Sequence, residues 1–217
     1  MKTLFAVLAL TAFGAPQSPP PAAQDLARAL QRKYDQVHSF TADFVHHYEG
    51  GVLRKSLTER GTVQVKKPGR MRWEYKVPEE KLFVSDGRKI YSYVPADRQV
   101  IVSTVPAEDQ ATTAVLFLVG KGNLTRDFKA TLLTGNDPKT WTLRLDPRTP
   151  QREYDWLIVT VDRASMQIKA LTAGDNQGTR SSFQFSNMRE NVDLPDKQFE
   201  FKIPRGADVI TSGSSER

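Results

Sequence analysis

The feature that most limits the possible folds is an alternation of apolar and polar residues in short runs along much of the chain. Residues 71, 73, 75 and 77 are apolar or aromatic, whereas residues 70, 72, 74 and 76 are charged. The runs 40–44, 141–145, 183–185 and 199–203 alternate in the same way. Because successive side chains of a strand point to opposite faces, these runs predict a sheet with one apolar and one solvated face.

Turn residues separate the runs at short intervals. Asp86-Gly87 joins the run 82–85 to 89–94 as in a tight hairpin, and Lys67-Pro68-Gly69 separates 62–66 from 70–77. Gly174 and Gly178 bracket a further reversal. We predict about eleven strands in one meandering antiparallel sheet. A sheet of that size with one apolar face must curl or close to hide it.

The sequence predicts one helix before the strands and one among them. Residues 22–37 predict an amphipathic helix with Leu26, Leu30, Tyr34 and Val37 on one stripe. Residues 108–120 predict a second helix, which is apolar nearly all round in its second half. Such a helix must be buried on several sides, either as a lid inside a curled sheet or as an ordinary core helix.

The first residues predict an export signal. Residues 4–15 carry no charge and follow Met1-Lys2, and prolines at 16 and 19–21 end the run. We interpret residues 1–23 as a signal peptide and proline-rich leader without a defined cleavage site, and 24–217 as one domain. The alternative is a buried N-terminal helix. The chain has no cysteine, which excludes disulfides, thiolate catalysis, cysteine zinc sites and N-terminal lipidation.

Residues that could carry chemistry are few. His46 and His47 are adjacent on a predicted strand and therefore point to opposite faces, which is poor geometry for a shared metal. The sequence has no HExxH, P-loop, GxSxG or GxGxxG pattern. The positive residues behind the net charge of +6 are spread along the predicted strands. Alternation places Arg70 and Arg72 on the solvated face and Trp73 on the apolar face. We therefore expect no enzyme activity, cofactor, metal or nucleic-acid partner.

What remains is an apolar interior that either lines a cavity for an apolar ligand or is a filled core. Periodicity alone does not distinguish the two. The residues predicted to line such a cavity are Phe40, Phe44, Met71, Trp73, Tyr75, Phe83, Tyr91, Tyr93, Trp141 and Phe183.

The order of several segments resembles the LolA family, the periplasmic carriers of outer-membrane lipoproteins. The segments are Val65–Tyr75, Leu82–Gly87, Tyr91–Tyr93, Thr113–Leu118, Phe183–Phe185 and Phe199–Gly206. The order and spacing of the resemblance extend over nearly all of the predicted mature chain. The resemblance implies an unclosed antiparallel β-barrel that encloses a hydrophobic cavity under a helical lid. It places Val115, Leu116, Phe117 and Leu118 in that lid.

The resemblance also implies a function and partners. Such a carrier takes acylated lipoproteins from an inner-membrane ABC transporter, shields their acyl chains across the periplasm and delivers them to an outer-membrane receptor. It is expected to be a monomer without cofactor. Family members carry an arginine before the proline, where this chain has Lys67. We therefore expect Lys67, Arg70 or Arg72 to latch the lid.

Three other functions are compatible with the same pattern. A relative of the same fold could bind glycolipids or sense envelope stress, and a β scaffold could carry an envelope hydrolase. The lipidated outer-membrane receptor is disfavoured, because this chain has no cysteine to modify.

Overall fold

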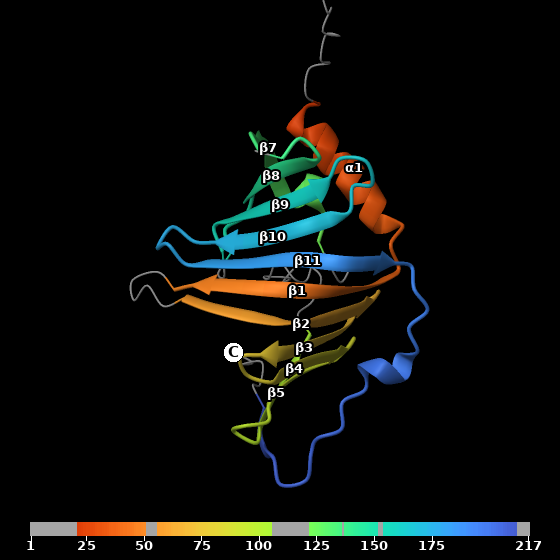
Figure 1. Ribbon diagram of the computed structural model, residues 1–217, viewed down its shortest axis with the longest axis vertical. Helices are drawn as coiled ribbons and strands as arrows, with labels where there is room; N and C mark the ends of the chain where they lie inside the picture. The colour runs from red at the N-terminus through yellow and green to blue at the C-terminus, as the bar shows by residue number, and fades with distance from the viewer. Residues whose placement is uncertain (1–20, 51–55, 106–121, 136, 152–153, 212–217) are drawn as a thin grey trace, which may run out of the picture.

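The computed structural model describes residues 21–50, 56–105, 122–135, 137–151 and 154–211. Their dominant feature is one curled sheet, whose strands lie side by side in the ribbon diagram (Figure 1). The strands are β1 (Ser39–Glu49), β2 (Ser56–Lys66), β3 (Arg70–Val77), β4 (Lys81–Asp86), β5 (Lys89–Val94), β6 (Gln99–Thr104), β7 (Phe128–Leu133), β8 (Thr140–Pro147), β9 (Trp156–Asp162), β10 (Ile168–Gly174), β11 (Arg180–Glu190) and β12 (Asp208–Thr211).

The strand order is β12-β6-β5-β4-β3-β2-β1-β11-β10-β9-β8-β7. Every described neighbouring pair is antiparallel except β12 with β6, which is parallel. In this ladder β7 and β12 form the two edges and do not pair with each other, so the sheet is an unclosed barrel. This confirms the predicted fold class, and the described residues contain one strand more than the predicted number.

Helix α1 (Ala23–Asp35) lies across one end of the sheet, near β7 to β10 (Figure 1). Its predicted stripe is buried, since Leu26, Leu30, Tyr34 and the following Val37 are all less than 7% exposed. These side chains join the main core with apolar residues of β1, β2, β3 and β8 to β11. We call the sheet face that carries this core the inner face, and the opposite face the outer face. A four-residue helix, α3 (Leu124–Asp127), packs beside α1.

The inner face also contains a close approach that only glycine allows. A Cβ atom on Gly61 would lie 1.9 Å from the Glu74 carbonyl oxygen and 2.9 Å from the Phe44 ring. The Phe44 ring therefore occupies space that any other residue at position 61 would fill. This lets Phe44 lie low on the sheet among its aromatic neighbours.

The segment after β11 corrects one prediction. Residues 199–203 form no strand, because the 3-10 helix η2 (Asp196–Phe199) is followed by unpaired extended backbone. Phe199 is buried, Phe201 packs on tyrosine rings and Ile203 is 45% exposed, so the three do not share a sheet face. An extended segment lying flat on another surface also alternates with period two, which explains the incorrect prediction.

The predicted signal peptide lies mostly outside the described residues, as does the predicted helix at 108–120. Within the described ranges, no helix is both long enough and apolar enough to cross a bilayer.

Candidate functional site

Aromatic side chains crowd the inner face around Phe44 on β1. The Phe44 ring centroid lies 5.0 Å from that of Trp73, 4.8 Å from Tyr75 and 6.0 Å from Phe183. Most of these rings meet edge to face or tilted, the arrangements that aromatic pairs favour. Strands β3, β1 and β11 thus place their rings in one cluster, across Gly61 of the intervening strand β2.

The structure places most of the predicted cavity residues together on this face. Cross-strand partners share a face, so the pair Trp73 and Phe83 extends the cluster to β4. Trp141 also faces inward, opposite Val161, but it lies at the far side of the sheet under the Arg163 guanidinium. The residues on the inner face are Phe40, Phe44, Met71, Trp73, Tyr75, Phe83, Trp141 and Phe183.

Tyr91 and Tyr93 lie on the outer face instead. Tyr91 pairs with Val84, which pairs with Arg72, and side chains adjacent in the sequence of β3 point to opposite faces. We call residues 191–207, between β11 and β12, the C-terminal segment. Both tyrosine rings pack on its Phe201, at 5.2 and 5.9 Å between ring centroids. The structure therefore does not bring these two residues into the inner-face cluster.

The exposure of the inner face changes along the strands. On β1 the inward residues Phe40 and Phe44 are 1% and 2% exposed, whereas Tyr48 at the other end is 37% exposed. Leu57, paired with Tyr48, and Val77 at the end of β3 are exposed as well. The inner face is thus sealed near α1 and open at the end where β1 and β3 terminate. We call these the closed end and the open end.

A polar network crosses the inner face toward the open end. His46 Nδ1 lies 3.0 Å from Glu59 Oε2, and His46 Nε2 lies 2.9 Å from Ser181 Oγ. Lys81 Nζ donates to Glu59 Oε1 at 2.8 Å. The imidazole stacks on the Phe183 ring at 4.2 Å. Glu59 at the centre of this network is only 4% exposed. The network around the buried carboxylate joins four strands across an otherwise apolar surface.

Burial lowers the pKa of His46, although the hydrogen bond and charge of Glu59 oppose this effect. A neutral imidazole has one N–H, and an ionised carboxylate only accepts hydrogen bonds. His46 therefore donates from Nδ1 to Glu59 and accepts at Nε2 from the Ser181 hydroxyl. Sequence analysis missed this network because its members come from four separate strands and match no motif.

The order serine, histidine, carboxylate is that of a hydrolase triad, but its setting differs. Ser181 lies within a strand and pairs with Tyr48 on one side and Ala173 on the other. The backbone N–H groups around it therefore serve the ladder and not an oxyanion hole. Lys81 also neutralises Glu59 directly. The arrangement suits fixed hydrogen-bonding groups better than a nucleophile.

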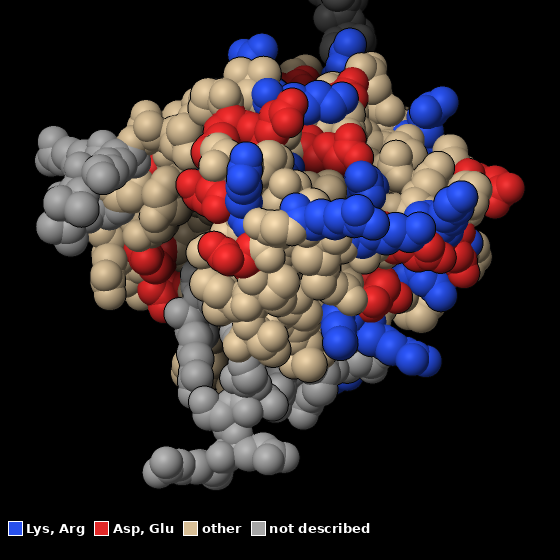
Figure 2. All heavy atoms as spheres, turned by 90° about the horizontal axis from the view of Figure 1, so that it is seen from below, with Lys and Arg blue, Asp and Glu red and all other residues tan. Residues whose placement is uncertain are grey.

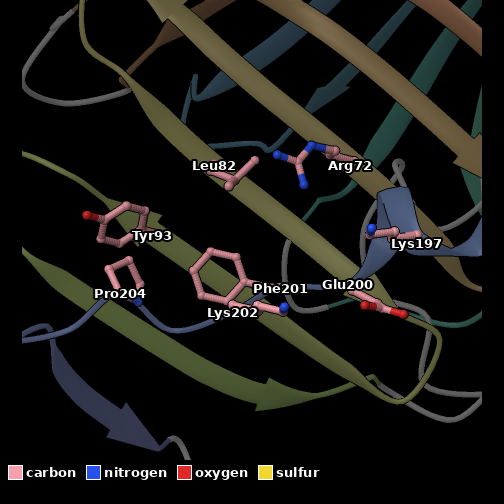
Figure 3. Close-up of a pocket in the computed structure, with 8 residues that line it drawn as sticks. All are labelled: Arg72, Leu82, Tyr93, Lys197, Glu200, Phe201, Lys202 and Pro204. Atoms are coloured by element: carbon pink, nitrogen blue, oxygen red, sulfur yellow. The ribbon is translucent and has the colours of Figure 1, made fainter.

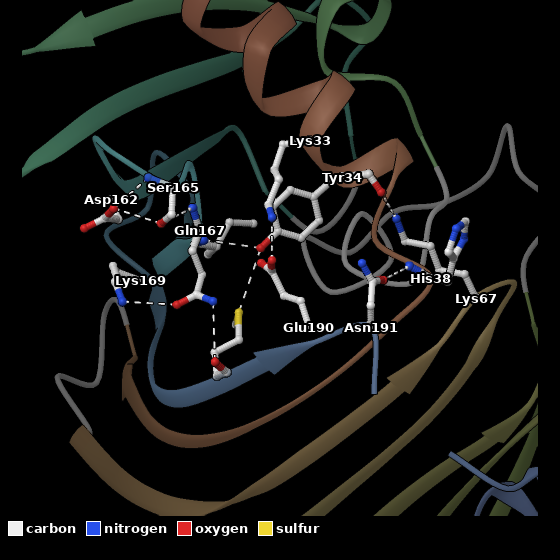
Figure 4. A network of polar contacts seen from close by, with 12 residues as sticks. Lys33, Tyr34, His38, Lys67, Asp162, Ser165, Gln167, Lys169, Glu190 and Asn191 are labelled. Carbon is white, nitrogen blue, oxygen red and sulfur yellow. Dashed lines mark hydrogen bonds and ion pairs between the residues drawn. The ribbon is translucent and has the colours of Figure 1, made fainter. Parts of the chain in front are cut away.

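Lys67 is one of the residues predicted to latch the lid. Within the described residues, its side chain forms a hydrogen bond to helix α1 (Figure 4). Its ammonium donates to the Tyr34 carbonyl oxygen in the last turn of α1 and lies 5.7 Å from the Tyr34 ring centroid. A cation is favourable at a helix C-terminus. Burial lowers the Lys67 pKa, against an opposing effect of Asp35. Lys67 thereby ties the turn between β2 and β3 to the helix that seals the closed end.

Tyr34 supports the same junction from the helix side. Its hydroxyl accepts a hydrogen bond from the Ile168 backbone N–H at 3.3 Å, and Lys33 pairs with Glu190 at 2.6 Å (Figure 4). These contacts join α1 to β10 and β11. The last turn of α1 is thus bonded to both halves of the curled sheet.

Arg70 and Arg72 lie on the outer face and contact the C-terminal segment. Arg70 lies 3.5 Å from Asp196, and Arg72 donates to the Gln198 carbonyl oxygen at 3.3 Å. This segment borders an outer-face groove (Figure 3), whose lining residues are Arg72, Leu82, Tyr93, Lys197, Glu200, Phe201, Lys202 and Pro204. The predicted lid residues Val115 to Leu118 lie outside the described residues, so the proposed latch contacts to them stay predictions.

Charge and metal-binding groups do not single out another site. On the face in Figure 2, positive and negative side chains are interspersed among uncharged ones. In the part of the chain that the structure describes, no group of three or more His, Cys, Asp or Glu residues could hold a metal ion.

Comparison with known proteins decides the family. Residues 35–202 match the family model described as outer membrane lipoprotein carrier protein LolA. The chain belongs to the LolA family. An outer-membrane lipoprotein carrier protein from Chromohalobacter salexigens is 30% identical over 187 residues, covering 86% of this chain and 87% of the relative. The carrier from Bordetella avium is 31% identical over 190 residues, covering 87% of each chain.

Solved structures share the fold of this LolA family member at low sequence identity. A conserved protein from Thermus thermophilus matches with a TM-score of 0.53 and 13% identity, covering 87% of this chain and 98% of the other. MucB matches with a TM-score of 0.50 and 17% identity, covering 83% of this chain and 62% of MucB. These likenesses show a common architecture and no more.

The half-buried His46 gives stability a specific pH dependence. Its folded-state pKa lies below the ordinary value of 6.5, so the unfolded chain takes up a proton first as the pH falls. The free energy of unfolding should therefore decrease as the pH falls from about 6.5 toward the lowered pKa. Denaturant titrations at stepped pH values would measure it. The variant His46→Gln should lose this decrease, and an equal decrease in both proteins would contradict the assignment.

The Lys67 contact predicts a stability loss that depends on the ammonium. Lys67→Met should lower the free energy of unfolding by about 1.5–3 kcal/mol, because a charged hydrogen bond to a helix carbonyl disappears. Lys67→Arg should recover part of it. As a control, Lys76→Met at an exposed position of β3 should change the free energy of unfolding by less than about 0.5 kcal/mol. Equal effects of Lys67→Met and Lys76→Met in chemical unfolding would contradict the anchoring role.

Proposed function

We propose that this protein is a periplasmic carrier that binds the acyl chains of lipoproteins on its inner face. Membership of a family of outer-membrane lipoprotein carriers supports the cargo class. The aromatic inner face around Phe44, Trp73 and Phe183 is the observation that carries the proposal, because it offers an apolar surface that opens toward solvent at one end.

The physical basis of binding is burial of hydrocarbon. Each methylene group removed from water contributes about 0.8 kcal/mol, so even part of one acyl chain supplies a large driving force. Release then requires a competing state of the carrier that has less affinity for the cargo. In this proposal the segment 108–120 acts as the lid that supplies the competing state.

The route is the one that the family function implies. Residues 1–23 export the chain and 24–217 form the single carrier domain. As a monomer, this domain receives lipoproteins from an inner-membrane ABC transporter and passes them to an outer-membrane receptor. No bond is made or broken at any step, and neither a cofactor nor a metal takes part.

Two neighbouring residues on β4 give a matched test of which face binds. Phe83 faces inward opposite Trp73, and Leu82 faces outward opposite Glu74. Phe83→Glu should weaken binding of a synthetic lipopeptide with a diacylglyceryl-cysteine N-terminus by more than about tenfold, because a carboxylate would lie against the acyl chains. Leu82→Glu should leave binding nearly unchanged. Isothermal titration with the exported protein would measure both.

Two outcomes would contradict the proposal. Equal weakening by Phe83→Glu and Leu82→Glu would remove the inner face as the binding surface. Native mass spectrometry of the gently purified protein provides the second check. Co-purified glycolipid without acylated lipoprotein would favour the glycolipid-binding alternative over a lipoprotein carrier.

A further inference from the structure

The inner face contains charged groups where apolar ones would serve a packed core better. Glu59 and Lys81 form an ion pair at 2.8 Å, with Glu59 4% exposed. Removing the Glu59 carboxylate from water is costly even beside the partly exposed Lys81, and apolar residues of similar volume are often as stable or more so at such positions. The pair therefore calls for an explanation other than stability.

Lys81 has donor capacity beyond this ion pair. An ammonium group has three N–H donors. Among the described residues, Lys81 Nζ contacts Glu59 Oε1 at 2.8 Å and Glu79 Oε2 at 3.6 Å. At least one donor is left for a ligand on the inner face. Glu59 is held in turn by His46, which Ser181 and the Phe183 ring fix from the other side.

A second donor on the same face finds no acceptor within the part of the chain that the structure describes. The indole Nε1 of Trp73 is buried and has no hydrogen-bond partner among the described residues, while Trp73 itself is 3% exposed. A buried N–H without an acceptor is costly, and native structures contain few of them. Trp73 and Tyr75 are successive inward-facing residues of β3, and Tyr75 pairs with Lys81 on β4. The two donors are therefore neighbours on one surface.

We propose that Lys81 and Trp73 form a polar subsite for the carbonyl oxygens of the linkages that attach acyl chains to the cargo. Ester and amide carbonyls only accept hydrogen bonds, which matches the remaining donor capacity of Lys81 and the Trp73 N–H, which has no acceptor among the described residues. The neighbouring Glu59 carboxylate favours such neutral acceptors over a second anion. This inference rests on the proposed carrier function and adds where the cargo's polar end lies.

The subsite also gives the cargo a direction. Lys81 begins β4, at the open end of the inner face where Tyr48 and Leu57 are exposed. Phe40, Val65 and Met71, at the closed end, are buried and apolar. The acyl chains then extend toward α1, and the linkages with the attached polypeptide stay at the open end. An amphipathic ligand of this orientation meets apolar surface with its tails and donors with its carbonyls.

A pair of matched ligands tests the subsite. Two lipopeptides would be compared, one with ester-linked palmitoyl chains and one with ether-linked hexadecyl chains that lack carbonyls. The exported wild-type protein should bind the ester form about tenfold more tightly, the amount expected from one hydrogen bond to a charged donor. Lys81→Met should remove most of this difference, since only the Trp73 donor remains, while affinity for the ether form stays unchanged. The control Lys76→Met, on the outer face, should keep the wild-type ratio.

Variants that keep the fold and a direct probe complete the test. Glu59→Gln combined with Lys81→Met avoids leaving a buried carboxylate unpaired and should give the same reduced ratio as Lys81→Met alone. Trp73→Phe keeps the ring, removes the N–H and should reduce the ratio in part. In the wild-type complex, the infrared stretch of a ¹³C-labelled ester carbonyl should shift to lower frequency, and Lys81→Met should diminish the shift.

Three results would overturn the subsite. Equal affinity of wild type for ester and ether forms would leave the carrier proposal standing and remove the subsite. Loss of affinity in Lys81→Met for free palmitate alone would show that the ammonium takes a carboxylate and not a linkage carbonyl. Failure of wild type to bind either lipopeptide would overturn the carrier function together with the subsite.

Discussion

The structure depends on a sheet whose two edges, β7 and β12, do not pair. A closed barrel would hide its apolar face by itself, whereas an open one must cover that face by other means. Helix α1 covers one end, and contacts from Lys67, Tyr34 and Lys33 fix its last turn to the sheet. The remaining inner face is left with a gradient from buried to exposed apolar residues, which is what a site for reversible binding of hydrocarbon requires.

The two faces of the sheet are covered by different segments and hold different groups. The inner face combines aromatic rings with one buried polar network, whereas the outer face carries Arg70 and Arg72 and binds the C-terminal segment through Asp196 and Gln198. Phe201 closes over Tyr91 and Tyr93 on that side. The C-terminal segment thus packs on the outer side of β3 to β5, and the inward residues of these strands lie on the other side of the sheet.

The sequence was sufficient for the alternation, the turns and the stripe of α1, because these depend on neighbours along the chain. The sequence was not sufficient to show which face of the sheet a residue takes where this depends on strand pairing across a turn. Tyr91 and Tyr93 alternate as inward residues do, but the register with Val84 sets them outward. It also missed His46, Glu59 and Lys81, since only strand pairing brings them together. Phe199 to Ile203 looked like a strand because extended chain on any surface alternates in the same way.

Two tryptophans on opposite faces of the sheet test most directly whether acyl chains contact the inner face. Trp73 lies in the inner aromatic cluster, whereas Trp156 lies on the outer face against Gly174, near the Arg144 and Arg180 guanidinium groups. Proteins in which Trp141 and one of these two tryptophans are replaced by phenylalanine would be titrated with a lipopeptide carrying brominated acyl chains, which quench tryptophan fluorescence at contact. The account predicts strong quenching of Trp73 and little of Trp156. Quenching of Trp156 without that of Trp73 would contradict it.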